Sequence, residues 1–242
     1  MRYAFEDGAC TEWPVAGDGL FWPRCARTTS SGSLLVADGR NGRVALISAA
    51  GDVEAELRTL RLEPPLDLDD PHDVRELPCG RLLVTDAQLD LVVEVDWDGH
   101  VSRSVGGPTG SVRLADPHSA QLLPGGELLI CDSGADRLLW VDADGSPARE
   151  LRILRRRRRL WRLRGPRHAD LAACGLLVVC DTANNRVLAA EPSGELVWEL
   201  TEVPGSPLPW LNQPRWAHLL GPDDVLVADH YHHRVLRLRR EA

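Results

Sequence analysis

The stretch of sequence that decides the fold is Asp116-Pro-His118-Ser-Ala-Gln-Leu-Leu-Pro-Gly-Gly126-Glu-Leu-Leu-Ile-Cys131-Asp132-Ser-Gly-Ala-Asp-Arg137-Leu-Leu-Trp-Val-Asp-Ala-Asp-Gly145. Alternating apolar residues, punctuated by Gly and Asp-Gly turns, predict three short strands rather than a helix. The first strand begins at His118, the second covers 127–131 and the third covers 138–141. Turns at 124–126 and after Asp132 separate them.

Four other segments repeat this pattern. The five copies begin at Pro23-Arg24, Pro71-His72, Pro117-His118, Pro166-Arg167 and Pro214-Arg215, and they recur every 46 to 49 residues. An Asp follows 14 residues after each Arg or His, at Asp38, Asp86, Asp132, Asp181 and Asp229. A period in the forties with several strands per unit is typical of a propeller blade, because one such sheet cannot bury both its faces alone.

The repeats therefore predict an all-β protein, a five-bladed β-propeller that forms a single domain over residues 1–242. The blades cover about 22–60, 70–107, 116–154, 165–202 and 213–242 together with 1–6. The last copy lacks a fourth strand, and residues 2–6 match that strand in copy four. We therefore expect the N-terminal strand to join the last blade and close the ring. Six blades are the alternative, if residues 7–22 form more than a connector.

Composition restricts the class of partner. The net charge of −8 argues against a general nucleic-acid binder. The sequence shows neither the apolar segment of a signal peptide nor a run of 18 apolar residues, so we expect a cytoplasmic protein without a membrane partner.

The hairpin of the first two strands places the repeated acids near basic side chains. In an unbroken antiparallel hairpin, the numbers of each two opposed residues add up to the same value. On that rule the Arg or His that opens the first strand lies opposite the Asp that ends the second strand. The expected pairs are Arg24–Asp38, His72–Asp86, His118–Asp132, Arg167–Asp181 and Arg215–Asp229. Because the first strand of a propeller blade is the innermost, all five pairs would surround one mouth of the central channel.

Several motifs resemble known families. Val36-Ala-Asp38-Gly-Arg-Asn-Gly-Arg43-Val, Cys180-Asp181-Thr-Ala-Asn-Asn-Arg186-Val and Val227-Ala-Asp229-His-Tyr-His-His-Arg234-Val resemble NHL repeats, which implies a propeller. Asp116-Pro-His118-Ser resembles the strand openings that carry zinc-binding histidines in peptidyl-hydroxyglycine alpha-amidating lyase. Pro71-His72-Asp73 and Arg167-His168-Ala resemble arylsulfotransferase repeats, in which channel His and Arg residues handle sulfate.

His72 and His118 occupy equivalent positions in adjacent blades, which indicates a site for a divalent transition metal such as zinc, copper or iron. Asp86 and Asp132 would orient the two rings. The expected third ligand is His168, with His218 and His230 as alternatives. The competing interpretation is that His simply replaces Arg as the partner of the repeated Asp.

The remaining candidates serve substrate binding and catalysis. Arg24, Arg167 and Arg215 could hold a carboxylate, phosphate or sulfate, or could instead be structural partners of the repeated acids. Four further arginines recur at the start of the third strand, where blade two has Leu91, and these are expected to be structural: Arg43, Arg137, Arg186 and Arg234. His230 and Tyr231 lie in one turn and could transfer a proton.

The resulting functional hypothesis is a small-molecule enzyme with a metal-dependent site at the channel mouth, a lyase or a group transferase for an anionic substrate. The alternative is a noncatalytic propeller that acts as a binding scaffold. The basic segment Arg155–Arg164 would then bind an acidic protein partner, unless the acidic loop 63–70 neutralises it within the molecule.

Overall fold

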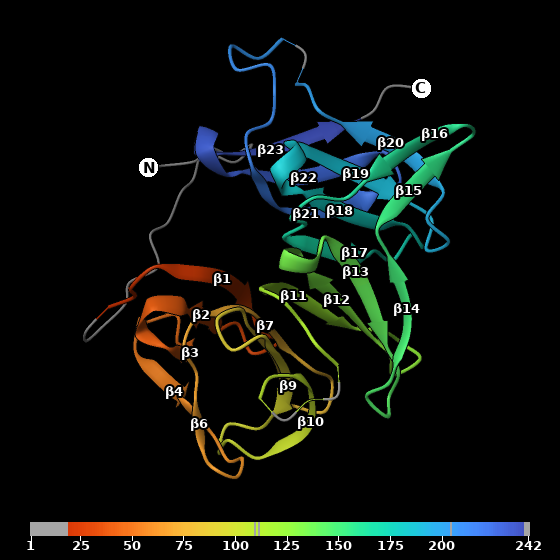
Figure 1. The fold of residues 1–242 in the computed structure, drawn as a ribbon. Coiled ribbons are helices and arrows are strands. Elements are labelled where there is room, and N and C mark those ends of the chain that lie inside the picture. The colour runs from red at the N-terminus through yellow and green to blue at the C-terminus, as the bar shows by residue number, and fades with distance from the viewer. Residues whose placement is uncertain (1–18, 109, 111, 204, 240–242) are drawn as a thin grey trace. The chain divides into compact units, whose positions relative to one another are not determined.

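The computed structural model describes residues 19–108, 110, 112–203 and 205–239. Its regular structure consists of short β-strands and four single-turn 3₁₀ helices, so the chain is all-β. The strands form five blades of propeller type, which confirms the fold class (Figure 1). The described residues divide into two compact units, the first covering 19–128 and 141–147 and the second covering 129–140 and 148–239, with the gaps given above.

The first unit contains two complete four-stranded antiparallel blades. Blade one has the order β1 (Pro23–Thr28), β2 (Leu34–Asp38), β3 (Arg43–Ile47) and β4 (Val53–Leu57). A small hairpin, β5 (Thr59–Leu60) and β6 (Leu66–Asp67), leads to blade two. Blade two is formed by β7 (Pro71–Glu76), β8 (Leu82–Asp86), β9 (Leu91–Val95) and β10 (Val101–Gly106).

Blade three consists of β11 (Pro117–Leu122), β12 (Leu128–Asp132), β13 (Arg137–Val141) and β14 (Pro147–Leu151). β11 belongs to the first unit, whereas most of β12, β13 and β14 belongs to the second. A two-stranded hairpin, β15 (Ile153–Arg156) and β16 (Arg159–Arg162), follows blade three.

The second unit also contains blades four and five. Blade four has the order β17 (His168–Leu171), β18 (Leu177–Asp181), β19 (Arg186–Ala190) and β20 (Leu196–Leu200). The described part of blade five is β21 (Pro214–Gly221), β22 (Asp224–Asp229) and β23 (Arg234–Arg239). The predicted closing strand at residues 2–6 lies outside the described residues.

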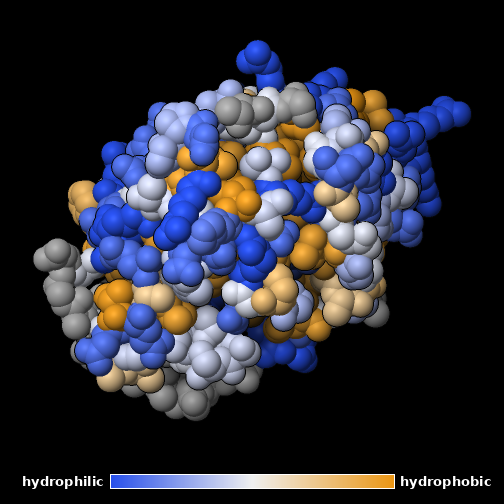
Figure 2. Space-filling view, turned by 90° about the horizontal axis from the view of Figure 1, so that it is seen from below, coloured by the Kyte–Doolittle hydropathy of each residue, from blue (hydrophilic) through white to orange (hydrophobic). Residues whose placement is uncertain are grey.

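Burial explains why the strands differ in composition. The second strand of blades two, three and four is buried along its whole length and is almost continuously apolar, as expected for a strand covered on both faces. β10 alternates exposed and partly buried residues over its first half, and every residue of β14 except the last is exposed. On the face shown in Figure 2, hydrophilic side chains predominate around several patches of hydrophobic residues.

The observed register corrects the predicted acid–base pairs. In blades one, two and five the repeated Asp lies opposite the Pro that opens the first strand: Pro23 opposite Asp38, Pro71 opposite Asp86 and Pro214 opposite Asp229. The register shifts immediately after each Pro, so the following Arg24, His72 or Arg215 is the extra residue of a β-bulge. A bulge turns its side chain away from the ladder direction. The prediction that these residues pair with the repeated Asp was therefore wrong.

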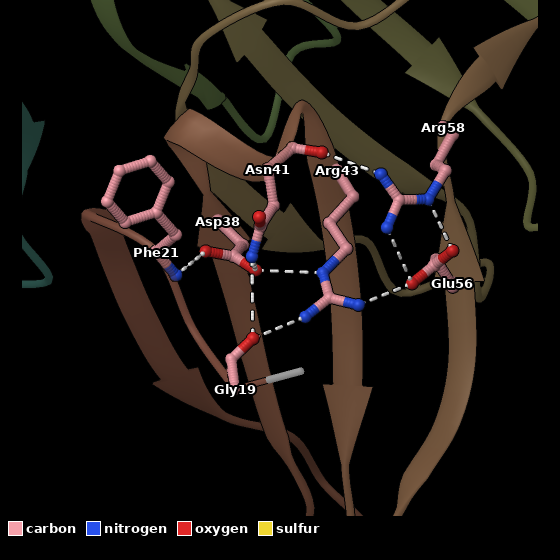
Figure 3. Close-up of polar contacts among 7 residues, drawn as sticks. All are labelled: Gly19, Phe21, Asp38, Asn41, Arg43, Glu56 and Arg58. Carbon is pink, nitrogen blue, oxygen red and sulfur yellow. Dashed lines mark hydrogen bonds and ion pairs between the residues drawn. The ribbon is translucent and has the colours of Figure 1, made fainter. Parts of the chain in front are cut away.

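The repeated Asp binds a different arginine. Asp38 is fully buried, and its Oδ2 accepts hydrogen bonds from Arg43 Nε at 2.8 Å and from the Asn41 amide at 2.7 Å (Figure 3). Its Oδ1 accepts one from the Phe21 backbone N–H at 2.8 Å. Arg43 also binds Glu56 at 2.6 Å. The carboxylate thus joins the end of β2, the start of β3 and the segment that enters β1.

The same arrangement recurs along the chain, as expected from the repeat. The Arg Nε to Asp Oδ2 distances are 2.7 Å for Arg137–Asp132, 2.7 Å for Arg186–Asp181 and 2.8 Å for Arg234–Asp229. Backbone N–H groups of the entering segments, at Arg164 and Asn212, bind the other oxygen of Asp181 and of Asp229. The predicted structural role of these third-strand arginines is confirmed.

Blade two is the exception, because Leu91 stands where the other blades have Arg. Asp86 accepts hydrogen bonds from the backbone N–H groups of Asp69, Asp70 and Leu89 instead. Burial raises the pKa of the Asp86 carboxyl, and these three donors offset that effect only in part. Among the described residues, the buried acid of blade two is therefore bound by backbone N–H groups, whereas its counterparts are bound by an arginine.

We predict that Arg43→Met destabilises the fold by about 3–5 kcal/mol, because it leaves the buried Asp38 carboxylate without its cationic partner. Equilibrium denaturant unfolding measures this change. Arg40→Met is the matched control, since Arg40 is exposed on the turn next to Asp38. An equally small loss of unfolding free energy in both variants would contradict the role assigned to Arg43.

Candidate functional site

His72 and His118 form the central feature of the candidate site. His72 is the bulge residue of β7, and His118 is the second residue of β11 in the same unit. Their ring centroids lie 4.3 Å apart, with an interplanar angle of 87°. Both side chains are nearly buried, with 9% of His72 and 5% of His118 exposed. The structure thus brings together the two histidines that the sequence indicated.

An acidic residue that sequence reasoning missed fixes the His72 ring. His72 Nε2 lies 3.1 Å from Asp70 Oδ2. Arg24 holds the same carboxylate at both oxygens, with Nε–Oδ1 at 3.0 Å and Nη2–Oδ2 at 2.5 Å. The expectation that Asp86 orients His72 was wrong, because Asp86 binds the backbone of the loop instead.

The electrostatics of Asp70 follow from these contacts. Burial would raise the pKa of the Asp70 carboxyl, but the Arg24 hydrogen bond and the charges of His72 and Arg24 outweigh burial and lower it. Asp70 is therefore ionised at neutral pH and can only accept hydrogen bonds, so its partner nitrogen must be the donor. The His72 Nε2 position accordingly carries hydrogen.

The backbone fixes the other ring. His118 Nδ1 lies 2.8 Å from the Asp116 carbonyl oxygen. A carbonyl oxygen can only accept, so Nδ1 carries the hydrogen and Nε2 carries the lone pair when the ring is neutral. The Asp116 backbone N–H in turn donates to Asp90 Oδ1 at 2.7 Å. Asp132, which the sequence suggested as the partner of His118, forms an ion pair with Arg137.

Both rings therefore meet the usual condition for metal-binding histidines. Such histidines almost always donate the other ring N–H to a carboxylate or a backbone carbonyl. His72 donates to Asp70 and His118 to the Asp116 carbonyl. Among the described residues, one group of three potential ligands lies close enough for an ion, Asp96, Asp98 and His100 at the β9–β10 turn, and it includes neither His72 nor His118.

The second unit holds the other predicted residues. His168 begins β17, is buried, and lies with its ring centroid 5.8 Å from that of Trp216. It belongs to a different unit from His72 and His118, so its role as their third ligand stays a prediction. His218 stacks on Trp216, with ring centroids 5.9 Å apart and an interplanar angle of 16°.

His230 and Tyr231 lie on the 3₁₀ turn η4 (His230–His232), with ring centroids 4.8 Å apart. Burial lowers the pKa of His230, and the positive charges of Arg215, His233 and Arg167 lower it further. Arg167 and Arg215 are thus near enough to affect His230. A neutral imidazole beside two guanidinium groups can accept a proton from an anionic molecule that the arginines bind.

The two residues that hold the histidine rings, Asp70 and Asp116, could have been found from a local sequence motif. Asp70 and Asp116 each begin an Asp-Pro-His tripeptide, and no other copy of the repeat has one. Their role depends on the bulge after Pro, because the bulge directs His72 back toward the residue two positions before it.

Comparison with known proteins supports the fold. No family model matches the sequence, and no curated protein matches it. The virginiamycin B lyase of Staphylococcus aureus is similar in structure, with a TM-score of 0.60 and 15% identity over 99% of this chain and 76% of that one. A Bacteroides caccae protein of unknown function gives a TM-score of 0.63 at 16% identity, covering 86% of this chain and 77% of that one.

The WD40 propeller domain of Doa1 gives a TM-score of 0.63 at 12% identity, over 88% of this chain and 62% of that one. These likenesses support a β-propeller, while the finer resemblance to NHL repeats and amidating lyase gains no support from them. No helix among the described residues is long and apolar enough to span a membrane.

We predict that Asp70→Asn lowers stability at pH 7 by about 1–3 kcal/mol, because Arg24 and His72 lose a charged acceptor. The folded-state pKa of Asp70 lies below its unfolded value, so its contribution is present above about pH 4 and disappears as the pH falls through the folded pKa. The difference between variant and wild type should therefore shrink in acid, as measured by denaturant unfolding at a series of pH values.

Asp69→Asn provides the control for this experiment, since Asp69 is the exposed neighbour and the charge change is the same. The Arg24–Asp70–His72 interactions would be contradicted if the loss of unfolding free energy in Asp70→Asn stayed the same at low pH. An equal loss of unfolding free energy in Asp69→Asn would contradict them as well.

Proposed function

We propose that this protein is a small-molecule enzyme, a lyase or a group transferase, in which His72 and His118 bind a divalent transition metal. The observation that carries the proposal is the anchoring of both rings. Each imidazole is nearly buried, each has one nitrogen held by a fixed acceptor, and the two rings are in contact. That combination is what a metal-binding histidine pair requires.

The bound metal would be zinc, copper or iron, the ions that imidazole ligands suit, and it would act as a Lewis acid on a substrate oxygen. Asp70 and the Asp116 carbonyl orient the two rings, and Arg24 keeps Asp70 ionised. In this proposal Arg24 acts mainly through Asp70, because both of its bonds to that carboxylate are made in the structure.

The second unit, taken by itself, holds a further group of residues with proposed roles. Arg167 and Arg215 bind an anionic group of the substrate by paired hydrogen bonds. His230, whose pKa is lowered by burial and by those arginines, accepts a proton, and Tyr231 is the alternative acid or base.

Structural neighbours support a lyase by analogy of fold. Two of them are structures of the Staphylococcus aureus virginiamycin B lyase, and one of these is a catalytically inactive His-to-Ala variant with quinupristin. A histidine therefore matters for catalysis in that protein. Fold alone does not carry activity from one propeller to another, so His72 and His118 are the residues that favour an enzyme here.

A noncatalytic scaffold is the second candidate. The likeness to the Doa1 WD40 propeller and the exposed arginines of the β15–β16 hairpin favour it. A scaffold of this kind needs the hairpin but does not need the two anchored imidazoles.

We predict that the purified protein binds one zinc, copper or iron ion per chain, and that His72→Ala with His118→Ala abolishes this binding. Elemental analysis after metal loading and dialysis gives the stoichiometry, and calorimetric titration with Zn²⁺ gives the affinity. Asp70→Asn should weaken binding by about 10–100-fold, because it releases the His72 ring.

His100→Ala is the control, because it removes the exposed Asp96–Asp98–His100 group and leaves the proposed site intact. Metal binding that survives the double histidine variant but is lost in His100→Ala would overturn the proposal. Absence of any bound metal after loading would favour the scaffold.

A further inference from the structure

The β15–β16 hairpin extends the edge of blade four. Its strands pair Leu154 with Trp161 and Arg156 with Arg159, so these four side chains share one face. Arg155 pairs with Leu160 on the opposite face. The hairpin is attached next to the start of β20 (Figure 1), where the Arg155 backbone N–H donates to the Gly194 carbonyl at 2.9 Å.

The charge of this hairpin is not neutralised. Arg155, Arg156, Arg157, Arg158 and Arg159 are all exposed, and none has a carboxylate partner among the described residues. Elsewhere the chain pairs its arginines, as Arg43, Arg137 and Arg186 show. Five adjacent cations on a protein of net charge −8 form a local field of opposite sign.

One face of the hairpin borders a groove. The groove has a volume of about 780 Å³ and lies between Arg156, Arg159 and Trp161 of the hairpin and Leu196, Trp198 and Glu199 of β20. The register predicts this division, because Arg156, Arg159 and Trp161 share a face and Arg155 does not. The groove therefore combines guanidinium groups with two indole rings.

Glu199 does not cancel the charge of the groove. Its Oε2 accepts a hydrogen bond from Trp161 Nε1 at 2.8 Å, and its Oε1 binds Arg186 at 3.0 Å. The carboxylate is thus paired with a third-strand arginine and fixes the Trp161 ring against β20. A preorganised ring loses little conformational entropy when a ligand packs against it.

We propose that this groove binds an acidic, partly apolar segment of a partner protein. Carboxylates of the segment would bind Arg156 and Arg159, and its apolar side chains would pack on Trp161 and Trp198. The net charge of −8 repels a long polyanion such as nucleic acid. A membrane surface is disfavoured because Trp161 is turned into the groove and bound to Glu199. This inference is independent of the histidine site.

The test is fluorescence anisotropy with a labelled peptide in which Glu alternates with Leu, using the full-length protein. We expect saturable binding that weakens as salt rises, because the contacts are charged. Arg159→Glu should weaken binding at least about tenfold. Arg155→Glu makes the same change in net charge on the opposite face of the hairpin and should have a much smaller effect.

Three results would overturn the proposal. The first is equal weakening by Arg155→Glu and Arg159→Glu, which would indicate diffuse charge without a groove. The second is equal binding of a peptide with Gln in place of Glu. The third is that wild type binds a single-stranded oligonucleotide, or vesicles of phosphatidylserine and phosphatidylcholine, more tightly than the Glu-Leu peptide, and that Arg159→Glu abolishes this binding. Zinc binding by Arg159→Glu should match wild type, which separates this test from that of the histidine site.

Discussion

The buried aspartate at the end of each second strand is the constraint on which the blades depend. Removing a carboxylate from water is costly unless cations and hydrogen-bond donors surround it. In blades one, four and five an arginine five residues later supplies the charge, and a backbone N–H of the entering segment supplies a further donor. One side chain thus links the second strand, the third strand and the chain entering the first strand.

The Asp–Arg ion pair also determines which residue types the first strand can have at its bulge position. Because Asp38 and Asp229 are already satisfied by Arg43 and Arg234, the bulge residues Arg24 and Arg215 are not needed to compensate them. The bulge position is therefore open to variation between blades. Blades two and three have His at this point in the sequence, and the two rings meet in one unit.

Much of the fold could be predicted from the sequence, because the spacing of Pro, Asp and turn Gly records the strand lengths directly. The repeat positions also predicted that His72 and His118 lie close together and that Arg43 and its equivalents are structural. The partners of the repeated acids did not. A simple hairpin rule assumes an unbroken ladder, and one bulge after Pro displaces the partner by a residue. Asp70 was missed because its contact depends on that bulge rather than on strand pairing.

The two proposed binding regions differ in physics. The histidine pair is nearly buried and held by fixed acceptors, as a metal site requires. The hairpin groove combines exposed arginines with an indole ring that is held by a hydrogen bond, which suits a partner bound by charge and by apolar contact. Each region depends on the strands beneath it, and Arg186 connects the hairpin groove to the buried Asp181 through Glu199.

A double-mutant cycle on unfolding free energy tests the central claim most directly. It compares the coupling of Asp38→Asn with Arg43→Met and the coupling of Asp38→Asn with Arg24→Met. The account predicts a coupling of about 1–3 kcal/mol for Asp38 with Arg43 and one near zero for Asp38 with Arg24. A larger coupling to Arg24 than to Arg43 would contradict it.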